Sequence, residues 1–276
     1  MLRKRPQAKT KVASGGAPRR TRARALFDRR IFGKPVAHRG LHDLKAGVIE
    51  NSGPAFLAAL RGGYAIECDL QPAADGTPMV FHDDKLDRLV DAAKGPLAKR
   101  TAKELRALPY RGQDATILSF ADFLKLVGGR TPLFVEVKAE KGVPPKIFLA
   151  KIASLARSYK GPIALMSFNH DVVEALARLA PRVPRGLVLG RHQVLKNWIK
   201  RAGRVSQATV LGRILDAAAP NVNFFAVDVN ILKNAAAWRK TGGHDLGLFS
   251  WTIRTKRQRA IADRYADAPI FEGYEA

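Results

Sequence analysis

The sequence is poor in three features: cysteine, long apolar runs and acidic residues. Its 276 residues include one cysteine, Cys68, which excludes a disulfide within the chain and fits a reducing compartment. No apolar run reaches the ~20 residues of a membrane-spanning helix. The basic N-terminus is not followed by an apolar core of signal-peptide type. We therefore expect a cytoplasmic protein.

Acidic residues are half as numerous as basic residues. The chain has 24 Asp and Glu against 48 Lys and Arg, which gives a formal charge of +24. Residues 1–30 hold eleven of the basic residues and a single acidic one, Asp28, with almost no apolar periodicity. This composition predicts a disordered basic tail, at least up to about Arg24. The tail is a solubilising segment, the product of a start codon placed too early, or a weak contact for anionic membrane lipids or nucleic acid.

Positive charge by itself would also fit a nucleic-acid-binding protein. The chain lacks the interleaved aromatic residues of a single-strand binder, and it has no compact recognition motif. We therefore do not expect nucleic acid as its main partner. The basic residues outside the tail would instead help to attract an anionic substrate.

Two predicted strands carry charged residues at alternating positions. Side chains of a strand alternate between its faces, so Glu67 and Asp69 share one face, and Glu136 and Lys138 share another. The simplest interpretation of one such strand is a half-exposed sheet with a solvated face. In an alternating β/α chain, however, strands are buried on both faces, so the carboxylates must be paired, protonated or bound to a metal.

Two histidines end further strand-like runs. His38 comes directly before Arg39 and Gly40, and His82 comes directly before Asp83. Imidazole titrates near neutrality, so both histidines are candidates for proton transfer. With the carboxylates and the two cations, they supply what metal-assisted cleavage of a phosphodiester requires. The other histidines and the cysteine are expected to be structural or surface residues: His42, Cys68, His170, His192 and His244.

Strand-like runs alternate with helical segments, which predicts an α/β fold, and the length agrees with a single α/β barrel, which commonly takes roughly 250 residues. Only residues 71–77 join the second and third strand-like runs, too short for a helical crossover, and Asp75-Gly76 marks a turn. These two runs should form a hairpin that returns His82 to the level of the paired carboxylates. Eight barrel strands then remain of the nine runs, which lie near residues 34–38, 65–70, 78–82, 133–138, 163–167, 186–189, 224–228, 247–252 and 269–272.

Short motifs with polar residues follow one another in a fixed order. They are Ala37-His38-Arg39-Gly40, Glu50-Asn51-Ser52, Ile66-Glu67-Cys68-Asp69, Val80-Phe81-His82-Asp83, Glu136-Val137-Lys138, Ser167-Phe168 and Trp251-Thr252. Over about residues 34–254, and most strongly in the first half, the chain resembles the glycerophosphodiester phosphodiesterase family. The resemblance implies a TIM-type (β/α)8 barrel over 31–276 with an insertion subdomain at about 83–118. It also implies a divalent cation, and hydrolysis of a small-molecule glycerophosphodiester to an alcohol and sn-glycerol 3-phosphate.

Strand patterns and resemblance together define candidate site residues. We expect Glu67, Asp69 and Glu136 to hold Mg²⁺ or Ca²⁺, hard cations that prefer oxygen ligands. His38 and His82 would divide proton removal from the nucleophile and proton donation to the leaving oxygen. Their order stays open, as does the choice between water and a substrate hydroxyl as the nucleophile. Further candidates are Arg39 and Lys138 for the phosphate, Trp251 for the glycerol carbons or the core, and Glu50, Asn51, Ser167 and Phe168 in supporting roles.

The second half of the chain departs from the family pattern at two places. Arg254 stands where the family usually has an asparagine soon after the Trp-Thr pair, and Phe271-Glu272 stands where a Thr-Asp pair often ends the last strand. We interpret both changes as affecting recognition of the glycerol or the headgroup, and not the phosphate chemistry. Our hypothesis for Arg254 is that it favours a more anionic headgroup.

Two further alternatives concern the same barrel. One is a lysophospholipase D-like or sphingomyelinase D-like enzyme that acts on lipids at a membrane surface, which exposed apolar side chains around the mouth would favour. The other is a catalytically inactive binding protein. The complete set of two histidines and three carboxylates argues against the second.

Overall fold

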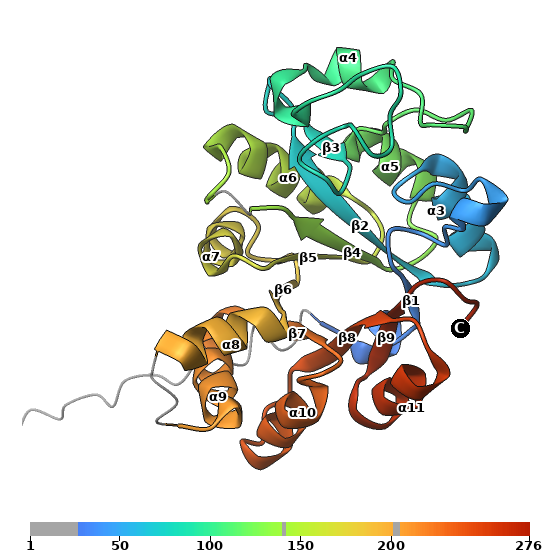
Figure 1. Ribbon diagram of the computed structural model, residues 1–276. Coiled ribbons are helices and arrows are strands. Elements are labelled where there is room, and N and C mark those ends of the chain that lie inside the picture. The colour runs from blue at the N-terminus through green and yellow to red at the C-terminus, as the bar shows by residue number, and fades with distance from the viewer. Residues whose placement is uncertain (1–26, 140–141, 201–204) are drawn as a thin grey trace, which may run out of the picture.

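The computed structural model describes residues 27–139, 142–200 and 205–276. Within these residues, nine strands form one sheet in the order β1-β9-β8-β7-β6-β5-β4-β2-β3, and an additional β1–β2 pairing closes it into a barrel (Figure 1). Every pair is parallel except β2–β3. The strands are β1 (Val36–Ala37), β2 (Ala65–Pro72), β3 (Pro78–Val80), β4 (Leu133–Val137), β5 (Ile163–Ser167), β6 (Arg185–Leu189), β7 (Phe224–Asp228), β8 (Gly247–Ile253) and β9 (Ala268–Phe271).

Helices surround the closed sheet as an outer ring (Figure 1). Together with the eight parallel strands, they confirm the predicted TIM-type barrel. None of the helices in the described ranges is long and apolar enough to cross a membrane. The helices are α2 (Arg29–Phe32), α3 (Gly53–Arg61), α4 (Ala102–Arg106), α5 (Phe120–Val127), α6 (Lys146–Ser158), α7 (His170–Leu179), α8 (Arg191–Lys200), α9 (Gln207–Ala218), α10 (Leu232–Thr241) and α11 (Lys256–Tyr265), with 3-10 turns at Leu44–Ala46, Leu97–Lys99 and Ala219–Asn221.

β2 and β3 form the hairpin that the short connection predicted. Leu70 pairs with Val80 in antiparallel register, and the Phe81 amide donates to the Asp69 carbonyl at 3.0 Å. His82 follows one residue later, so it returns to the level of the β2 carboxylates. This is why a histidine more than ten positions from Glu67 enters the same site.

The two faces of the barrel strands carry different side chains. Outward residues such as Cys68 and Val135 are buried in the layer between the strands and the helices. Inward, the rings of Phe134, Phe224 and Phe249 pack edge to face, with centroids 4.8–5.6 Å apart. This aromatic cluster fills the amino-terminal half of the barrel, so the inward polar residues have space only at the carboxyl ends of the strands.

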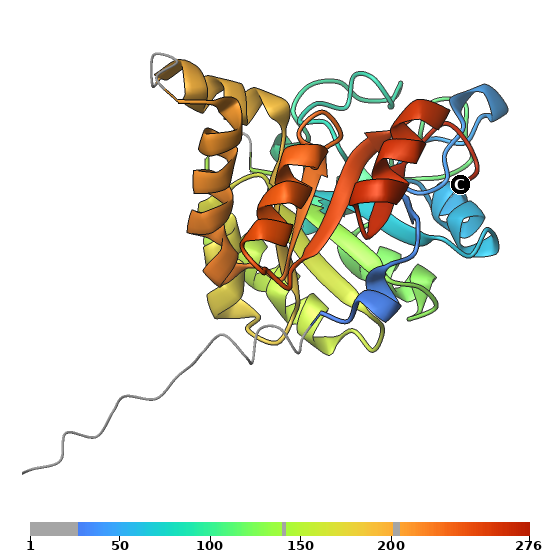
Figure 2. The same ribbon diagram turned by 90° about the horizontal axis from the view of Figure 1, so that it is seen from below.

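The short helix α2 closes the amino-terminal end of the barrel, opposite α8 (Figure 2). Phe27 stacks on Phe32 with ring centroids 4.6 Å apart, and Phe32 meets Phe134 at 5.6 Å. Asp28 caps the helix by accepting from the Arg30 amide at 2.9 Å. The expected tail, residues 1–30, lies outside the described residues except for 27–30. The partly buried Phe27 also stacks on Phe224, with centroids 5.1 Å apart, so this end of the expected tail packs against the barrel.

Residues 83–118, expected to be an insertion, extend beyond β3 at the edge of the barrel mouth (Figure 1). They contain the Leu97–Lys99 turn and α4, whose capping box joins Thr101 and Glu104. Their apolar side chains form a cluster separate from the barrel core, together with Phe81 from the hairpin. The segment therefore packs as a small unit against β3.

Cys68 offers a simple test of this packing. Its side chain is fully buried on β2. Burial is the main cause that raises the pKa of the thiol well above its ordinary value, and the negative charge of the neighbouring Glu67 adds to it. Only the thiolate reacts with alkylating reagents. We expect iodoacetamide to leave the native protein unmodified, even in alkaline buffer, and to add one label per chain after unfolding in urea. Intact-mass measurement checks this, and rapid labelling of the native protein would contradict the burial.

Candidate active site

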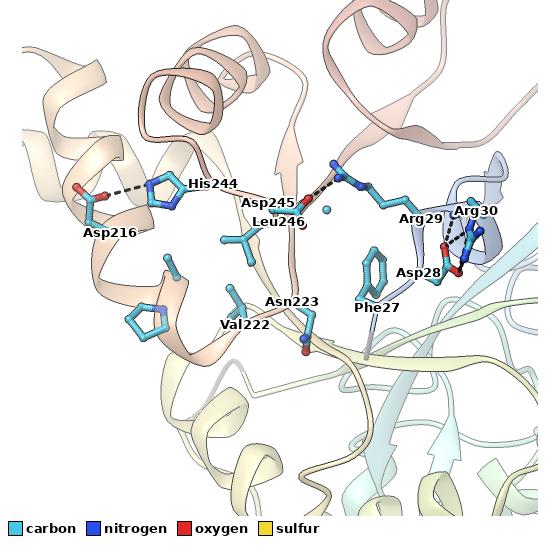
Figure 3. A pocket seen from close by; sticks show the side chains of 13 residues that line it. Phe27, Asp28, Arg29, Arg30, Asp216, Val222, Asn223, His244, Asp245 and Leu246 are labelled. Atoms are coloured by element: carbon cyan, nitrogen blue, oxygen red, sulfur yellow. Dashed lines mark hydrogen bonds and ion pairs between the residues drawn. The ribbon is translucent and has the colours of Figure 1, made fainter. Parts of the chain in front are cut away.

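The described residues form several cavities, and two of them lie at opposite ends of the barrel. The larger, of about 630 Å³, lies at the amino ends of the strands, near Phe27 and Asn223 (Figure 3). Its charged side chains are already paired: Arg29 with Asp245, and His244 with Asp216. None of the expected site residues lines this cavity. We therefore do not assign the chemistry to it, although it is the larger of the two.

The second cavity, of about 320 Å³, opens at the carboxyl ends of the strands, where active sites of such barrels lie. Most of the expected site residues line it. The others lie directly behind its wall: Asp69, Glu50, Asn51 and Ser167. Its lining residues are His38, Arg39, Glu67, His82, Glu136, Lys138, Met166, Phe168, Val188, Trp251, Thr252, Arg254 and Ile270.

Three carboxylates from two neighbouring strands meet at this cavity: Glu67 and Glu136 line it, and Asp69 lies beside them. Asp69 on β2 lies opposite Glu136 on β4, and Glu67 lies two residues before Asp69 on the same face. Carboxylate oxygens of all three lie within 4.8 Å of one another, and the three side chains are buried. Burial, then the charges of Asp69 and Glu136, raise the pKa of Glu67 well above its ordinary value. Like charges held this close out of water require a compensating cation.

The donor set fits a divalent cation. Three carboxylates supply the oxygen ligands that Mg²⁺ and Ca²⁺ prefer. Among the described residues, Glu67 Oε1 is buried without a hydrogen-bond partner, whereas Glu67 Oε2 accepts from the Arg39 amide at 3.0 Å. An unpartnered buried carboxylate oxygen is costly unless something else binds it. The three side chains therefore form a possible metal site.

Two basic side chains lie against these carboxylates. Lys138 Nζ is 2.9 Å from Glu136 and 3.3 Å from Asp69, and Arg39 Nε is 3.3 Å from Asp69. Burial alone would raise the pKa of Asp69, but Lys138 and Arg39 hold it below its usual range. Asp69 therefore stays ionised, while both cations remain close to where an anion would enter.

Residues with left-handed backbone conformation shape the loop after β1. Arg39 has φ +57°, and the next residue, Gly40, has φ +80° and lies so close to Ala55 that a Cβ there would clash with its backbone. Asn51, with φ +54°, donates to Asp69 at 2.9 Å through its amide. Glu50 accepts from Arg39 at 2.8 Å. Asn51 and Glu50 thus orient residues of the cavity and do not line it.

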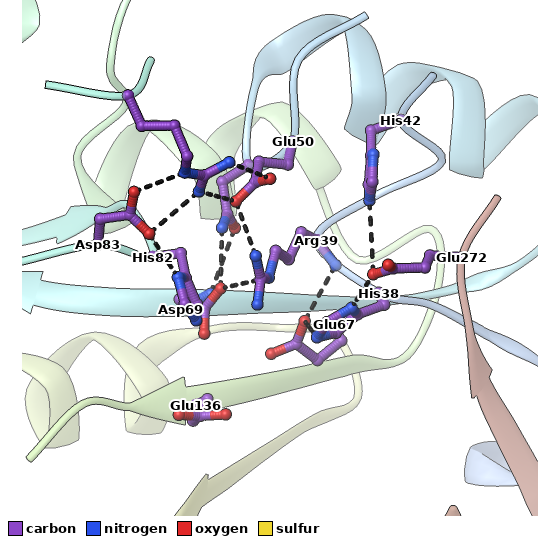
Figure 4. A network of polar contacts seen from close by, with 12 residues as sticks. His38, Arg39, His42, Glu50, Glu67, Asp69, His82, Asp83, Glu136 and Glu272 are labelled. Carbon is purple, nitrogen blue, oxygen red and sulfur yellow. Dashed lines mark hydrogen bonds and ion pairs between the residues drawn. The ribbon is translucent and has the colours of Figure 1, made fainter. Parts of the chain in front are cut away.

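Each of the two candidate histidines contacts a carboxylate through Nδ1 (Figure 4). His38 Nδ1 lies 2.6 Å from Glu272, and His82 Nδ1 lies 2.7 Å from Asp83. An ionised carboxylate only accepts, so Nδ1 carries the proton in both contacts, and Nε2 is the ring nitrogen that can exchange a proton in the cavity. His38 Nε2 lies 3.9 Å from Glu67, on the cavity side. Burial lowers the pKa of His38 although Glu272 opposes it, which favours the neutral ring.

Arg88 and the contact of Glu272 with His38 were not predicted from the sequence. Arg88, from the insertion, donates to Glu50 at 2.7 and 2.9 Å and to Asp83 at 2.7 and 3.0 Å. No local pattern marks it, because Glu50 is 38 positions away. Glu272 was visible as a carboxylate at the end of the last strand. We had linked it to substrate recognition, but it contacts His38, and Arg254 pairs with Glu272 as well.

The remaining candidates have different surroundings. Phe168 and Trp251 both line the cavity and meet edge to face, with centroids 5.3 Å apart, while Trp251 Nε1 donates to the Ala226 carbonyl at 3.1 Å. Ser167 is buried and donates to the Val137 carbonyl at 2.8 Å, so its hydroxyl joins two strands. His42, expected to be structural or at the surface, lies 3.8 Å from Glu272.

Residues 38–271 match the model of the glycerophosphoryl diester phosphodiesterase family. The chain is also similar to a glycerophosphodiester phosphodiesterase of Caldanaerobacter subterraneus subsp. tengcongensis, with 28% identity over 164 residues. The similar part is 55% of this chain and 65% of the relative. The chain thus spans a little less than two thirds of that relative's length.

Two solved structures have a similar fold. One is a glycerophosphodiester phosphodiesterase from Agrobacterium tumefaciens, with a TM-score of 0.64 and 20% identity over 86% of this chain and 95% of that chain. The other is a phosphodiesterase from Oleispira antarctica in complex with the product sn-glycerol-3-phosphate, with a TM-score of 0.67 and 19% identity over 86% and 92%. The family model covers most of the sequence and includes all three carboxylates and both histidines. This chain therefore belongs to the glycerophosphoryl diester phosphodiesterase family.

Proposed function

We propose that this protein hydrolyses small glycerophosphodiesters to an alcohol and sn-glycerol 3-phosphate. The observation that carries the proposal is one cavity in which three buried carboxylates, two cations and two carboxylate-backed imidazoles meet. The product bound by the Oleispira antarctica phosphodiesterase supports the same chemistry in a protein of similar fold.

Glu67, Asp69 and Glu136 would hold the divalent cation, Mg²⁺ or Ca²⁺. When bound, such a cation stabilises the negative charge that grows on the phosphate during attack. The task of the chain is to keep the three carboxylates ionised and close together. Lys138 and Arg39 do this for Asp69, and the β2–β4 register aligns Asp69 with Glu136.

Arg39 and Lys138 would contact the remaining phosphate oxygens. The planar guanidinium of Arg39 can donate to two oxygens at once, whereas Lys138 acts as a compact point charge. Both lie beside carboxylates at present, at 2.9–3.3 Å. A phosphodiester that enters the cavity would therefore meet cations already in position.

His38 and His82 would transfer the protons. Because Nδ1 of each ring faces a carboxylate, the free Nε2 is the atom that removes or gives a proton in the cavity. One ring, unprotonated at Nε2, would remove the proton of the nucleophile, and the other, protonated at Nε2, would give that proton to the leaving alcohol oxygen. Phe168 and Trp251 offer an apolar wall for the glycerol carbons.

A lipid substrate is the second candidate, because exposed apolar side chains occur around the mouth. Leu44 (71% exposed) and Val143 (55%) lie on the loops after β1 and β4, and Ile147 (55%) begins α6. Ile199 (67%) lies on α8, which runs along the mouth end of the barrel, while α9 descends beside the strands (Figure 2). These side chains would suit a substrate held in a membrane surface.

A coupled assay for glycerol 3-phosphate, together with detection of the released headgroup alcohol, tests both candidates, because cleavage of a lysophospholipid yields lysophosphatidic acid and not glycerol 3-phosphate. Glycerophosphocholine, glycerophosphoethanolamine, glycerophosphoglycerol and the matching lysophospholipids are offered to wild type and to His38→Ala, with and without a chelator. We expect wild type to act on the deacylated substrates only in the absence of the chelator. Activity of His38→Ala in the presence of the chelator would refute the mechanism. Faster cleavage of the lysophospholipids would move the assignment to the lipid enzyme.

A further inference from the structure

We infer that Glu272 is the positioning residue that orients His38 for proton transfer, and that Arg254 holds Glu272 in place and does not select the headgroup. The catalytic part of this inference rests on the proposed function. The structural part, the orientation of the His38 ring, does not. Both residues are departures from the family pattern, and in the structure they contact each other.

The strand register places the three side chains in a row. β8, β9 and β1 are neighbours in the barrel. Arg254, Glu272 and His38 are each the first residue after one of these strands. The Glu272 amide donates to the Ile253 carbonyl at 3.1 Å, and the His38 amide donates to the Phe271 carbonyl at 2.9 Å. Backbone hydrogen bonds therefore align the three residues before any side-chain contact forms.

The side-chain contacts continue this row. Glu272 Oε2 lies 2.6 Å from His38 Nδ1, and Glu272 Oε1 accepts from Arg254 Nε at 2.5 Å. Each oxygen of the carboxylate thus has its own partner, so the carboxylate cannot rotate without losing both. The Glu272 side chain is 17% exposed, whereas Arg254 is 56% exposed. Arg254 therefore shields the carboxylate from the solvent at the mouth.

The orientation of the ring decides which nitrogen is available. With Nδ1–H bound to Glu272, the proton-accepting Nε2 of His38 faces the cavity, on the side of Glu67. Without the carboxylate, no hydrogen bond at Nδ1 would hold this rotamer, and a histidine ring in water prefers the Nε2–H tautomer. His42 Nε2 lies 3.8 Å from the same oxygen of Glu272. Glu272, and not His42, is therefore the partner of His38 Nδ1. Glu272 thus fixes the ring orientation and the tautomer of His38 that proton transfer needs.

The same contacts argue against a headgroup-selecting role for Arg254. An arginine that recognises an extra negative charge has to present an uncompensated guanidinium. Here, Arg254 pairs with Glu272, and its amide donates to Gln258 at 2.8 Å in the capping box of α11. The pair carries no net charge. Holding Glu272 in place is an alternative to our sequence-based hypothesis that Arg254 favours an anionic headgroup, and the headgroup series below distinguishes the two.

The structural part is tested by nuclear magnetic resonance of ¹⁵N-histidine-labelled protein, which measures the tautomer of His38. His38→Gln assigns its resonances among those of the six histidines. We expect the Nδ1–H form in wild type, in Glu275→Gln and in Arg257→Ala, two exposed controls close to the pair in sequence. In Glu272→Ala we expect a shift to the Nε2–H form. An unchanged tautomer in Glu272→Ala would overturn the inference, whether or not the protein is an active phosphodiesterase.

The catalytic part is tested with glycerophosphodiesters of cationic, neutral and anionic headgroup. Glu272→Ala and Arg254→Ala should each lower kcat by about tenfold to a hundredfold with little change in KM, equally for all headgroups. The double variant should lose no more kcat than the less active of the two single variants, because both residues act through His38. Glu272→Gln, which keeps an acceptor at the same place, should recover part of kcat.

Two outcomes would overturn the catalytic part. One is a loss in Arg254→Ala confined to anionic headgroups and expressed in KM, which would make Arg254 a selector. The other is normal kcat in Glu272→Ala. Resistance of Cys68 to alkylation shows that each variant keeps the native packing, so misfolding would not be mistaken for either result.

Discussion

Glu67→Gln is expected to lower kcat/KM for glycerophosphodiesters by about a thousandfold, the effect of losing several kcal/mol of charge stabilisation in the transition state. Glutamine has nearly the same shape and can still accept from the Arg39 amide, which lies 3.0 Å from the carboxylate. It brings no negative charge to the cation, however. The affinity for Mg²⁺ or Ca²⁺ should fall as well. Steady-state kinetics against cation concentration and calorimetric titration of each cation measure the two effects.

Glu104→Gln is the matched control for this substitution. Glu104 is exposed in the capping box of α4 and accepts from the Thr101 amide at 2.7 Å, a contact that glutamine also makes. We expect wild-type kinetics and wild-type cation binding from this variant. Normal activity and cation affinity in Glu67→Gln would show that Glu67 is not a ligand. Wild-type turnover that survives a chelator would show that no exchangeable cation takes part.

His38→Ala and His82→Ala should each lower kcat by about 10²–10⁴-fold on an alkyl phosphodiester, the usual contribution of a general acid or base. The two variants should differ on the p-nitrophenyl ester of glycerol phosphate. Nitrophenol is a far stronger acid than an alkyl alcohol, so it leaves without a proton from the protein. The variant that lacks the proton donor should therefore recover most of its activity, and the variant that lacks the base should not.

This comparison also decides which histidine is the acid. His244→Ala is the control, because His244 lines the cavity at the opposite end of the barrel and should leave both activities unchanged. Release of nitrophenol by absorbance and of glycerol 3-phosphate by a coupled enzyme are the two measurements. If both variants recovered, or neither did, the two imidazoles would not divide the proton transfers between them.

Local sequence patterns predicted much of the barrel and the position of the carboxylates. The period of two in a strand is a property of neighbouring residues, so it places Glu67 with Asp69 without knowledge of the fold. The connection between β2 and β3 is too short for a helix, which predicted the hairpin and the return of His82. Both inferences use only chain geometry over a few residues, and the structure agrees with them.

Contacts between distant segments were not predictable in the same way. Glu272 lies 234 positions from His38, and Arg88 lies 38 positions from Glu50. A carboxylate or guanidinium at a strand end has many possible partners, and only the closed barrel brings β9 beside β1. For this reason, we interpreted Arg254 and Glu272 as substrate-binding residues, whereas they form a pair beside His38.

The sequence by itself determined the fold class, the family resemblance, and the residue types available for phosphodiester chemistry. These depend on composition, on periodicity and on short motifs, all of which are local. The tertiary structure alone decided which carboxylate backs each histidine, that the insertion contributes Arg88, and that the charge of Arg254 is neutralised by Glu272. The contacts of Glu272 depend on barrel closure, which places the first residue after β1, β8 and β9 side by side although β1 and β9 lie at opposite ends of the chain. The contacts of Arg88 depend on how the insertion packs against the loop after β1.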